Sequence, residues 1–333
     1  MSARPRLLLT MGDVAGIGPE IIARAWPALQ AFCRPVVVGD ETWMRQALRL
    51  VQSRAQVAVV QNPQDVAPAA DVVPLLAGSV QDLNGVEVGR VSAAAGKAAH
   101  DFLCLAVDET LAGRADGIVT APLHKEGLHA AGVAHPGHTE ILAERTGTRH
   151  FAMMLYARSP QLPLGLGVVH VTLHMALREV FQHLSSAAVL EKIRLLDGIL
   201  RRLGRQPPRL AVAALNPHAG DGGLFGDEES RLLQPALRTA QAEGIAVSGP
   251  WPSDTLFVRA TRGECDGIVA MYHDQGHIPL KLLGGLHAVN VTVGLPLVRT
   301  SVAHGTAYDI AGRGVADATS LIEAVRVAAL LCN

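Results

Sequence analysis

Polar side chains crowd one short segment of the sequence, MYHDQGHIPLK, at residues 271–281. It directly follows the apolar run CDGIVA, which is typical of a buried strand. In open α/β sheets, ligands bind outside the carboxyl ends of the strands, so this segment is a natural place for chemistry. The alternative is a polar turn that happens to contain histidine, because single histidines often only satisfy local hydrogen bonds.

Three histidines stand near the ends of separate predicted strands: His174 in VVHVTLHMALRE, His218 in LNPHAGDGG and His273 in MYHDQG. Imidazole is the commonest protein ligand of zinc-like metals, and a catalytic site takes three protein ligands and leaves one position open. The three lie far apart in the sequence, so spacing alone does not prove that they converge. His170 competes with His174, since residues i and i+4 of a strand point the same way.

A second set of residues is suited to a phosphate or a carboxylate. Lysine is a compact charge and arginine a two-pronged donor, while threonine and asparagine add neutral donors. For each residue alone, a solvated surface position is the plainer interpretation. Lys281 and Arg299, however, follow apolar strand-like runs. The set consists of His138, Thr139, Lys281, Asn290 and Arg299.

Two glycine-rich segments are candidates for nucleotide binding. The opening MGDVAGIGPEII lacks the third glycine of GxGxxG and the lysine of a Walker loop, so it does not predict a nucleotide loop of either kind. The segment HGTAYDIAGRGVADATS, residues 304–320, offers backbone donors and the acids Asp309 and Asp317 to an adenosine. A plain surface turn before the C-terminal helix is an equal alternative.

The composition excludes several classes of protein. Hydrophobic residues make up 49% of the 333 residues and aromatic ones only 4%, which predicts an aliphatic core. Lys and Arg number 29 against 30 Asp and Glu, a balance that argues against nucleic-acid and membrane-surface binding. Four scattered cysteines form no CxxC pair and are typical of reduced thiols in a cytosolic protein. No apolar run reaches the roughly 18 residues that span a bilayer.

Short aliphatic runs alternate with alanine-rich amphipathic stretches along the chain. The runs predict strands, and the stretches predict helices after Pro19 and over residues 92–112, 187–203 and 232–243. This alternation predicts βαβ units and a largely parallel sheet. The length allows two domains or one large α/β body, with a weakly marked break near residues 122–127.

Seven motifs together resemble one family along most of the chain: MGDVAGIGPE, GHTE, VTLHMALRE, LNPHAGDGG, SDTLF, MYHDQGHIPLK and GLPLVRTSVAHGTAYDIAGRGVAD. The sequence resembles the 4-hydroxythreonine-4-phosphate dehydrogenase family and its paralogues acting on four-carbon aldonate 4-phosphates. The resemblance implies an α/β fold with two α/β/α domains and a central cleft, like isocitrate and isopropylmalate dehydrogenases. It implies a cofactor-side domain of residues 1–125 plus about 300–333, a substrate, metal and dimerisation domain of residues 126–299, and a cytoplasmic homodimer with a shared active site.

The resemblance also implies roles for the residues. A divalent metal (Zn, Mg or Co) is expected on His174, His218 and His273, with Asp254 and Lys281 as catalytic residues; a metal-bound water is the other candidate proton acceptor. The expected substrate-binding residues are His138, Thr139, Lys281, Asn290 and Arg299. The segment from residue 304 is similar to a nicotinamide-cofactor loop for NAD or NADP, with His304, Gly305, Thr306, Asp309 and Asp317 as its binding residues.

The implied reaction is oxidation of the C3 hydroxyl of a small 4-phosphorylated four-carbon hydroxy acid, followed by decarboxylation, as in pyridoxine biosynthesis. His277 departs from the GLPVLK form of that enzyme and favours the threonate or erythronate 4-phosphate paralogues. A branch that oxidises aromatic dihydrodiols tends to lose the asparagine and Arg-Thr of VNVTVGLPLVRT, which are intact here. A hydrolase or aldolase without nucleotide and a non-catalytic sugar-acid phosphate sensor are the remaining alternatives.

Overall fold

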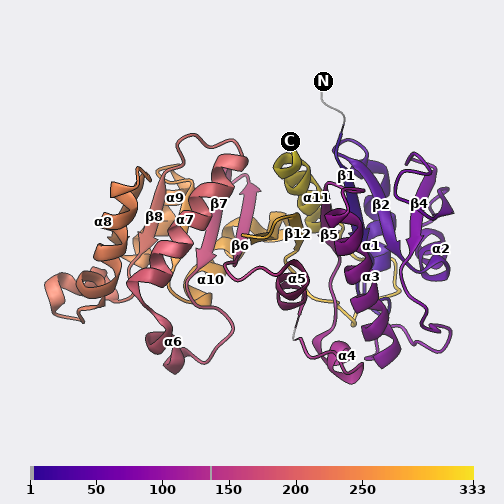
Figure 1. Cartoon of the computed structure of the whole chain (residues 1–333), viewed down its shortest axis with the longest axis horizontal. Helices are drawn as coiled ribbons and strands as arrows, with labels where there is room; N and C mark the ends of the chain where they lie inside the picture. Colours follow the sequence, from indigo (N-terminus) through magenta and orange to yellow (C-terminus); the bar gives the residue numbers. More distant parts are fainter. Residues whose placement is uncertain (1–3, 136) are drawn as a thin grey trace. The chain divides into compact units, whose positions relative to one another are not determined.

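The computed structural model describes residues 4–135 and 137–333. The chain divides into two compact units (Figure 1). Unit 1 comprises the chain up to Arg149 and the segment Leu295–Asn333, and unit 2 comprises His150–Gly294. The domain boundaries expected from the family resemblance stay a prediction.

Unit 1 is built on a parallel sheet with the strand order β3-β4-β2-β1-β5-β12. Leu7, Leu8 and Leu9 of β1 are completely buried, as expected for a central strand covered on both faces. Helix α3 packs against β1, β2 and β5, and α11 packs against β5 and β12. The strands are β1 (Arg6–Thr10), β2 (Arg34–Gly39), β3 (Gln56–Val60), β4 (Val72–Ala77), β5 (Gly117–Thr120) and β12 (Val298–Val302); the helices are α1 (Gly18–Leu29), α2 (Glu41–Leu50), α3 (Ala93–Leu111), α4 (Lys125–Ala130), α5 (His138–Thr146) and α11 (Thr319–Cys332).

Unit 2 has a mixed sheet with the strand order β11-β6-β7-β10-β8-β9. The pairs β11–β6 and β6–β7 are antiparallel, whereas β7–β10, β10–β8 and β8–β9 are parallel. The strands are β6 (Ala152–Ser159), β7 (Leu162–His170), β8 (Leu210–Ala213), β9 (Val247–Trp251), β10 (Gly267–Ala270) and β11 (Ala288–Val293); the helices are α6 (Leu177–His183), α7 (Ser186–Arg202), α8 (Gln234–Ala242), α9 (Ser253–Thr261) and α10 (His273–Gly284), with short turns η1 (Pro217–Gly223), η2 (Glu229–Leu233) and η3 (Gly285–His287).

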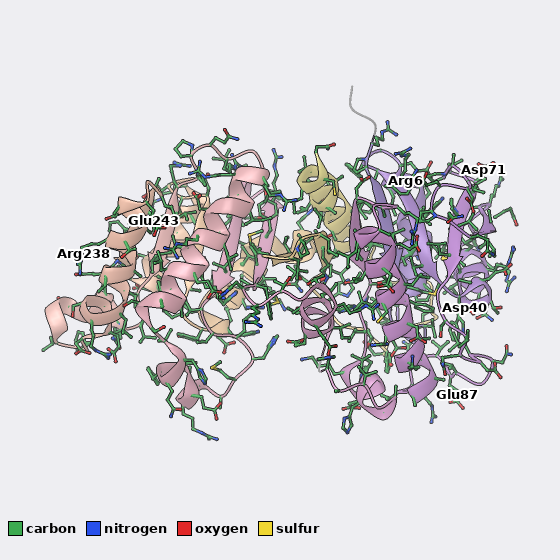
Figure 2. All side chains as sticks on the ribbon, in the orientation of Figure 1. Arg6, Asp40, Asp71, Glu87, Arg238 and Glu243 are labelled. Atoms are coloured by element: carbon green, nitrogen blue, oxygen red, sulfur yellow. The ribbon has the colours of Figure 1, made fainter. Side chains whose placement is uncertain are left out.

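The local sequence explains how several helices begin. Pro19 occupies the first turn of α1, where its missing N–H breaks no helical bond. The side chains of Ser92 and Ser185 accept hydrogen bonds from the first turns of α3 and α7. Charged side chains such as those of Arg238 and Glu243 on and beside α8 are exposed to solvent (Figure 2).

The predicted mixed α/β fold is confirmed. The interpretation of the polar segment after β10 as a turn is wrong, however, because the segment forms α10 from His273 onward. A short amphipathic segment next to a strand end carries no decisive local signal, and only packing against the sheet selects the helix. No helix among the described residues is long and apolar enough to cross a membrane.

Two helical glycines predict opposite responses to alanine. A Cβ on Gly96 in α3 would lie 2.1 Å from the backbone oxygen of Gly127, so Gly96→Ala should force α3 and α4 apart and reduce the free energy of unfolding by about 1–3 kcal/mol. The matched control is Gly198→Ala in α7, where a Cβ would meet nothing within 4 Å and should stabilise the fold by roughly 0.5–1 kcal/mol. Urea unfolding measures the free energy of unfolding of both variants. Equal effects of the two substitutions would contradict the close packing of α3 against α4.

Candidate active site

The three predicted metal ligands of unit 2 follow neighbouring parallel strands. β10 pairs in parallel with β7 on one side and with β8 on the other. His174 comes shortly after β7, His218 lies in η1 after β8, and His273 begins α10 after β10. Because the carboxyl ends of adjacent parallel strands lie at one edge of a sheet, the topology brings the three segments to the same edge.

The side chains of two of these histidines lie close together. The ring centroids of His174 and His273 are 5.8 Å apart. Nδ1 of His273 lies 2.7 Å from a carboxylate oxygen of Asp274, a contact that keeps the proton on Nδ1 and leaves Nε2 as the donor to a metal. His218 is exposed, with its ring 6.3 Å from that of Phe225.

The donor types and strand positions of these histidines fit a divalent metal ion. Within residues 4–135 and 137–333, however, no group of three or more His, Cys, Asp or Glu side chains is arranged to hold one. His174 and His273 are brought together, and the side chain of His218 does not complete the set. The three-histidine ligand set therefore stays a prediction.

A buried histidine pair lies behind His273. Nδ1 of His277 is 3.1 Å from Nε2 of His170, and the His277 ring stacks on that of His273 with centroids 3.7 Å apart. Burial, and then the neighbouring imidazoles, lowers the pKa of His170 to about 3 and that of His277 to about 4, so both are neutral at pH 7. His170 is only 2% exposed, whereas His174 is exposed, which favours His174 as the ligand. The pair leaves no space for a side chain at Gly276, whose Cβ would lie 2.4 Å from Nε2 of His170.

Gln275 ties the start of α10 to the start of α9. Its Oε1 accepts a hydrogen bond from Met271 N (2.6 Å), and its Nε2 donates to Ala214 O (2.7 Å) and Ser253 Oγ (2.8 Å). The predicted proton acceptor, Asp254, follows Ser253 directly and is exposed in the first turn of α9. The Gln275 contacts thus fix the backbone beside this carboxylate.

Of the predicted substrate residues, Lys281 and Asn290 belong to unit 2. Lys281 is exposed in the last turn of α10, and its charge contributes to the lowered pKa of His277, so the ammonium acts on the histidine cluster. Asn290 is half-buried in β11.

The other predicted substrate residues form an electropositive cluster in unit 1. Arg299 of β12 is 3% exposed, and its Nη2 donates to Thr120 Oγ1 over 2.6 Å. Burial lowers the pKa of Arg299 to about 10, against the charge of Glu140, so the guanidinium remains ionised at pH 7. Burial and then the Arg299 charge hold the pKa of His138 well below its usual value. His138 and Thr139 begin α5, where backbone N–H groups favour an anion.

The predicted cofactor segment is fastened to the opening motif of the chain. Tyr308 donates its hydroxyl to Asp13 Oδ2 (2.7 Å), and Ala15 N donates to Oδ1 (2.9 Å). Burial raises the pKa of Asp13, while the two hydrogen bonds oppose that shift. Glu20 of α1 also binds the segment: its carboxylate accepts a hydrogen bond from the backbone N–H of Ala316 over 2.7 Å.

The five predicted cofactor residues have different surroundings. Gly305 and Asp309 are exposed, His304 is half-buried, and Thr306 is buried. The carboxylate of Asp317 accepts the N–H of Thr319 over 2.7 Å at the start of α11. A capping role for Asp317 therefore competes with a role in binding a cofactor.

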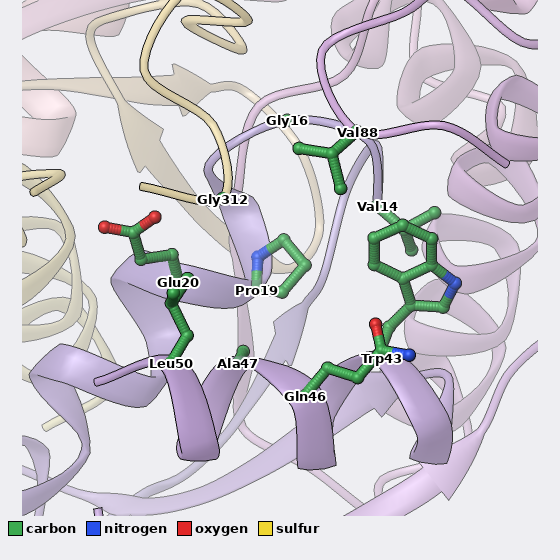
Figure 3. A pocket seen from close by; sticks show the side chains of 10 residues that line it. All are labelled: Val14, Gly16, Pro19, Glu20, Trp43, Gln46, Ala47, Leu50, Val88 and Gly312. Atoms are coloured by element: carbon green, nitrogen blue, oxygen red, sulfur yellow. The ribbon is translucent and has the colours of Figure 1, made fainter. Parts of the chain in front are cut away.

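A cavity of about 210 Å³ lies in unit 1 between the opening motif, α2 and residue Gly312 (Figure 3). Pro19, Trp43 and Leu50 are among its lining residues. Gly312 lies in the predicted cofactor segment, but none of the five predicted cofactor residues lines this space. The cavity therefore gives no support to their assignment.

Sequence reasoning missed several residues that organise these sites. Asp13 lies three residues after the end of β1, and an acid close to an apolar strand is a signal in the sequence, because buried acids need partners. Its partner Tyr308 is 295 residues away, and no local pattern links the two. Thr120 and Glu229 were missed for the same reason, since their roles come from tertiary contacts.

A family model described as pyridoxal phosphate biosynthetic protein PdxA matches residues 31–328. The chain belongs to this family. It is 47% identical over 316 residues to a 4-hydroxythreonine-4-phosphate dehydrogenase of Beijerinckia indica, covering 95% of this chain and 91% of the relative. It is 45% identical over 333 residues to a D-threonate 4-phosphate dehydrogenase of Cupriavidus necator, covering 99% and 98%. The expected enzyme class, a dehydrogenase of the PdxA family, is thereby confirmed.

Solved structures agree with this assignment. The 4-hydroxythreonine-4-phosphate dehydrogenase from Klebsiella pneumoniae superposes with a TM-score of 0.87 at 41% identity, covering 99% of this chain and all of that chain. A terephthalate 1,2-cis-dihydrodiol dehydrogenase from Burkholderia xenovorans superposes with a TM-score of 0.67 at 30% identity, covering 98% of each chain. The structure is therefore more similar to the 4-hydroxythreonine-4-phosphate dehydrogenase than to the dihydrodiol dehydrogenase.

The Asp13–Tyr308 bond predicts a pH-dependent loss of stability. Removing one partner of a buried hydrogen bond to a charged group costs about 1–3 kcal/mol, so Tyr308→Phe should reduce the free energy of unfolding by about that at pH 8. The bond favours the ionised carboxyl. The loss should therefore shrink as the pH falls through the raised pKa of Asp13, and urea unfolding at pH 8 and pH 5 measures it.

The control is the same substitution in an Asp13→Asn chain. Without an ionisable group at position 13, the cost of Tyr308→Phe should be the same at both pH values. A cost that is independent of pH in the chain with Asp13 would contradict an ionised acceptor.

Proposed function

We propose that this protein is a metal-dependent NAD(P) dehydrogenase that oxidises the C3 hydroxyl of a 4-phosphorylated four-carbon hydroxy acid, with subsequent decarboxylation. The observation that carries the proposal is the buried guanidinium of Arg299 beside the start of α5. The relatives act, by their names, on 4-phosphates, and the substrate phosphate is the ligand that this cluster would bind.

A phosphate suits this cluster for physical reasons. A phosphate offers several oxygens to the guanidinium fork in charge-assisted hydrogen bonds. Thr120 directs one side of the Arg299 fork, and the N–H groups at the start of α5 add neutral donors. His138 is neutral at pH 7 and can donate a hydrogen bond without adding a second charge. Lys281 and Asn290 would hold the rest of the substrate.

Within this proposal, His174, His218 and His273 would hold a divalent metal ion, and Asp274 fixes the tautomer of His273. The chemistry supplied by such an ion is Lewis acidity, which lowers the pKa of a bound hydroxyl and polarises a ketone. Asp254 would accept the hydroxyl proton, from a backbone position held by the Gln275 contacts. Lys281 would orient the substrate anion beside it.

A nicotinamide cofactor supplies hydride acceptance, which no side chain provides. His304, Gly305, Thr306, Asp309 and Asp317 would hold it. Support comes from the exposed Asp309 carboxylate, a group type that binds ribose hydroxyls, and from the exposed backbone at Gly305. The Asp13–Tyr308 bond would keep this segment in place when the cofactor leaves.

Two groups of substrates remain within the family: 4-hydroxythreonine 4-phosphate, and the two aldonates D-threonate and D-erythronate 4-phosphate. One observation favours the second group. His277, the departure from the GLPVLK form, stacks on His273 and is hydrogen-bonded to His170, so it changes the wall behind a predicted metal ligand. A dihydrodiol offers no phosphate oxygens to the Arg299 guanidinium.

We also propose two α/β/α domains around a cleft, as in isocitrate and isopropylmalate dehydrogenases, with residues 1–125 plus about 300–333 on the cofactor side and residues 126–299 forming the other. A homodimer is supported by an apolar stripe on α10 and η3, formed by Ile278, Leu282 and Leu286, which are 56%, 80% and 52% exposed. A cytoplasmic location is supported by four free cysteines.

Substitution of Arg299 tests the proposed phosphate contact. Charge-assisted hydrogen bonds contribute roughly 1.5–3 kcal/mol each, so Arg299→Met should lower kcat/KM for a 4-phospho acid by about ten- to a hundred-fold or more. The same variant should hardly change kcat/KM for the dephosphorylated acid. Arg326→Met, which removes a half-buried arginine of α11 paired with Glu323, is the matched control and should leave both values near those of the unsubstituted chain. Equal losses on both substrates would show that Arg299 does not bind the phosphate.

A further inference from the structure

His218 lies in a strained turn. The five residues 218–222 all have positive φ, between 45° and 79°. Three of them, His218, Ala219 and Asp221, are not glycine. Left-handed backbone costs an L-residue roughly 1–2 kcal/mol, so such a run persists only where its surroundings hold it.

The buried carboxylate of Glu229 holds the chain just before this turn. Glu229 begins η2 and is 4% exposed. Its Oε1 accepts the backbone N–H groups of Leu215 (2.9 Å) and Asn216 (2.7 Å), and its Oε2 accepts the side-chain amide of Asn216 (3.0 Å). Both carboxylate oxygens thus bind Leu215 and Asn216, which lie between β8 and the turn.

The same carboxylate also meets the middle of the turn. A Cβ on Gly220 would lie 2.8 Å from Glu229 Oε2, so the turn passes close to the carboxylate at this glycine. Phe225 N donates to Gly220 O (3.1 Å) and closes the segment on its far side. Glu229 therefore lies against the chain on both sides of His218: at Leu215 and Asn216 before it, and at Gly220 after it.

We propose that Glu229 is the positioning residue of His218: its carboxylate fixes the left-handed turn that holds this imidazole at the carboxyl end of β8, beside the end of β10. The inference rests on the proposed function, in which His218 is a metal ligand. In this proposal Glu229 is not itself a ligand: its two oxygens accept three N–H groups of Leu215 and Asn216. Its effect on the metal passes through His218.

The charge of Glu229 is part of this role. Asn216 directs its amide donors at Oε2 of Glu229 and at Glu228 Oε2 (2.7 Å). In Glu229→Gln, one oxygen still accepts the two backbone N–H groups, but an amide NH2 would face the Asn216 amide. The turn would then lose one support and keep two, whereas Glu229→Ala would lose all of them.

The test measures Co²⁺ and Zn²⁺ binding to the full chain by calorimetry. Glu229→Gln should weaken the affinity by about ten- to a hundred-fold, the range found when partners of metal ligands are removed. Glu228→Gln, at the neighbouring carboxylate that accepts a hydrogen bond from the Asn216 side chain, is the matched control and should bind nearly as the unsubstituted chain does. Circular dichroism and the melting temperature show whether each variant folds. If Glu229→Ala does not fold, Glu229→Gln alone carries the test.

A double-variant cycle separates positioning from other roles. In a His218→Ala chain, Glu229→Gln should cause no further loss of metal affinity, because the ligand that it positions is gone. A further loss of similar size would overturn the proposal, since Glu229 would then act as a ligand or support the fold in general. Unchanged affinity of Glu229→Gln, in a chain that His218→Ala does weaken, would overturn the role of Glu229 alone. A chain that binds no metal, or that His218→Ala does not affect, would overturn the proposed ligand set itself.

Discussion

The parallel pairing of β10 with β7 and β8 is the constraint on which the candidate site of unit 2 depends. It sends three separate chain segments over one edge of the sheet, each with a histidine. Behind that edge, the neutral His170–His277 pair fills the space under His273, and Gly276 leaves room for it. After β8, Glu229 binds the backbone that leads into the left-handed turn. The strands thus determine where the imidazoles lie, and buried polar contacts determine how they are held.

Buried charge is used differently in the two units. In unit 2, the buried carboxylate of Glu229 accepts three N–H groups of Leu215 and Asn216 and so supports the chain after β8. In unit 1, Arg299 is as deeply buried; its Nη2 donates to Thr120 Oγ1, and the charge of Glu140 opposes the effect of burial on its pKa. A guanidinium group presents several N–H donors in a planar fork that suits the oxygens of a phosphate. This difference is why Arg299, rather than any of the buried acids, supports a proposal about the substrate.

Much of the fold and part of the site could be predicted from the sequence. Aliphatic runs followed by His174, His218 and His273 were visible because burial and strand ends leave local patterns. The helical form of the segment after β10, the antiparallel β6 and the contacts of Asp13 and Glu229 were not. Each of them depends on residues that are distant in the sequence or on packing against the sheet, which composition and spacing do not record. The family resemblance supplied the enzyme class, since fold and residue types alone left a hydrolase and a sensor open.

The most direct measurement is NADH formation by the purified chain, with a divalent metal present, over a panel of substrates. The panel holds 4-hydroxythreonine 4-phosphate, D-threonate and D-erythronate 4-phosphates, and an aromatic dihydrodiol. The account predicts NADH with at least one of the phosphorylated acids, its loss after chelation of the metal, and none with the dihydrodiol. Saturable binding of NAD without NADH from any phosphorylated acid, or turnover of the dihydrodiol alone, would contradict it.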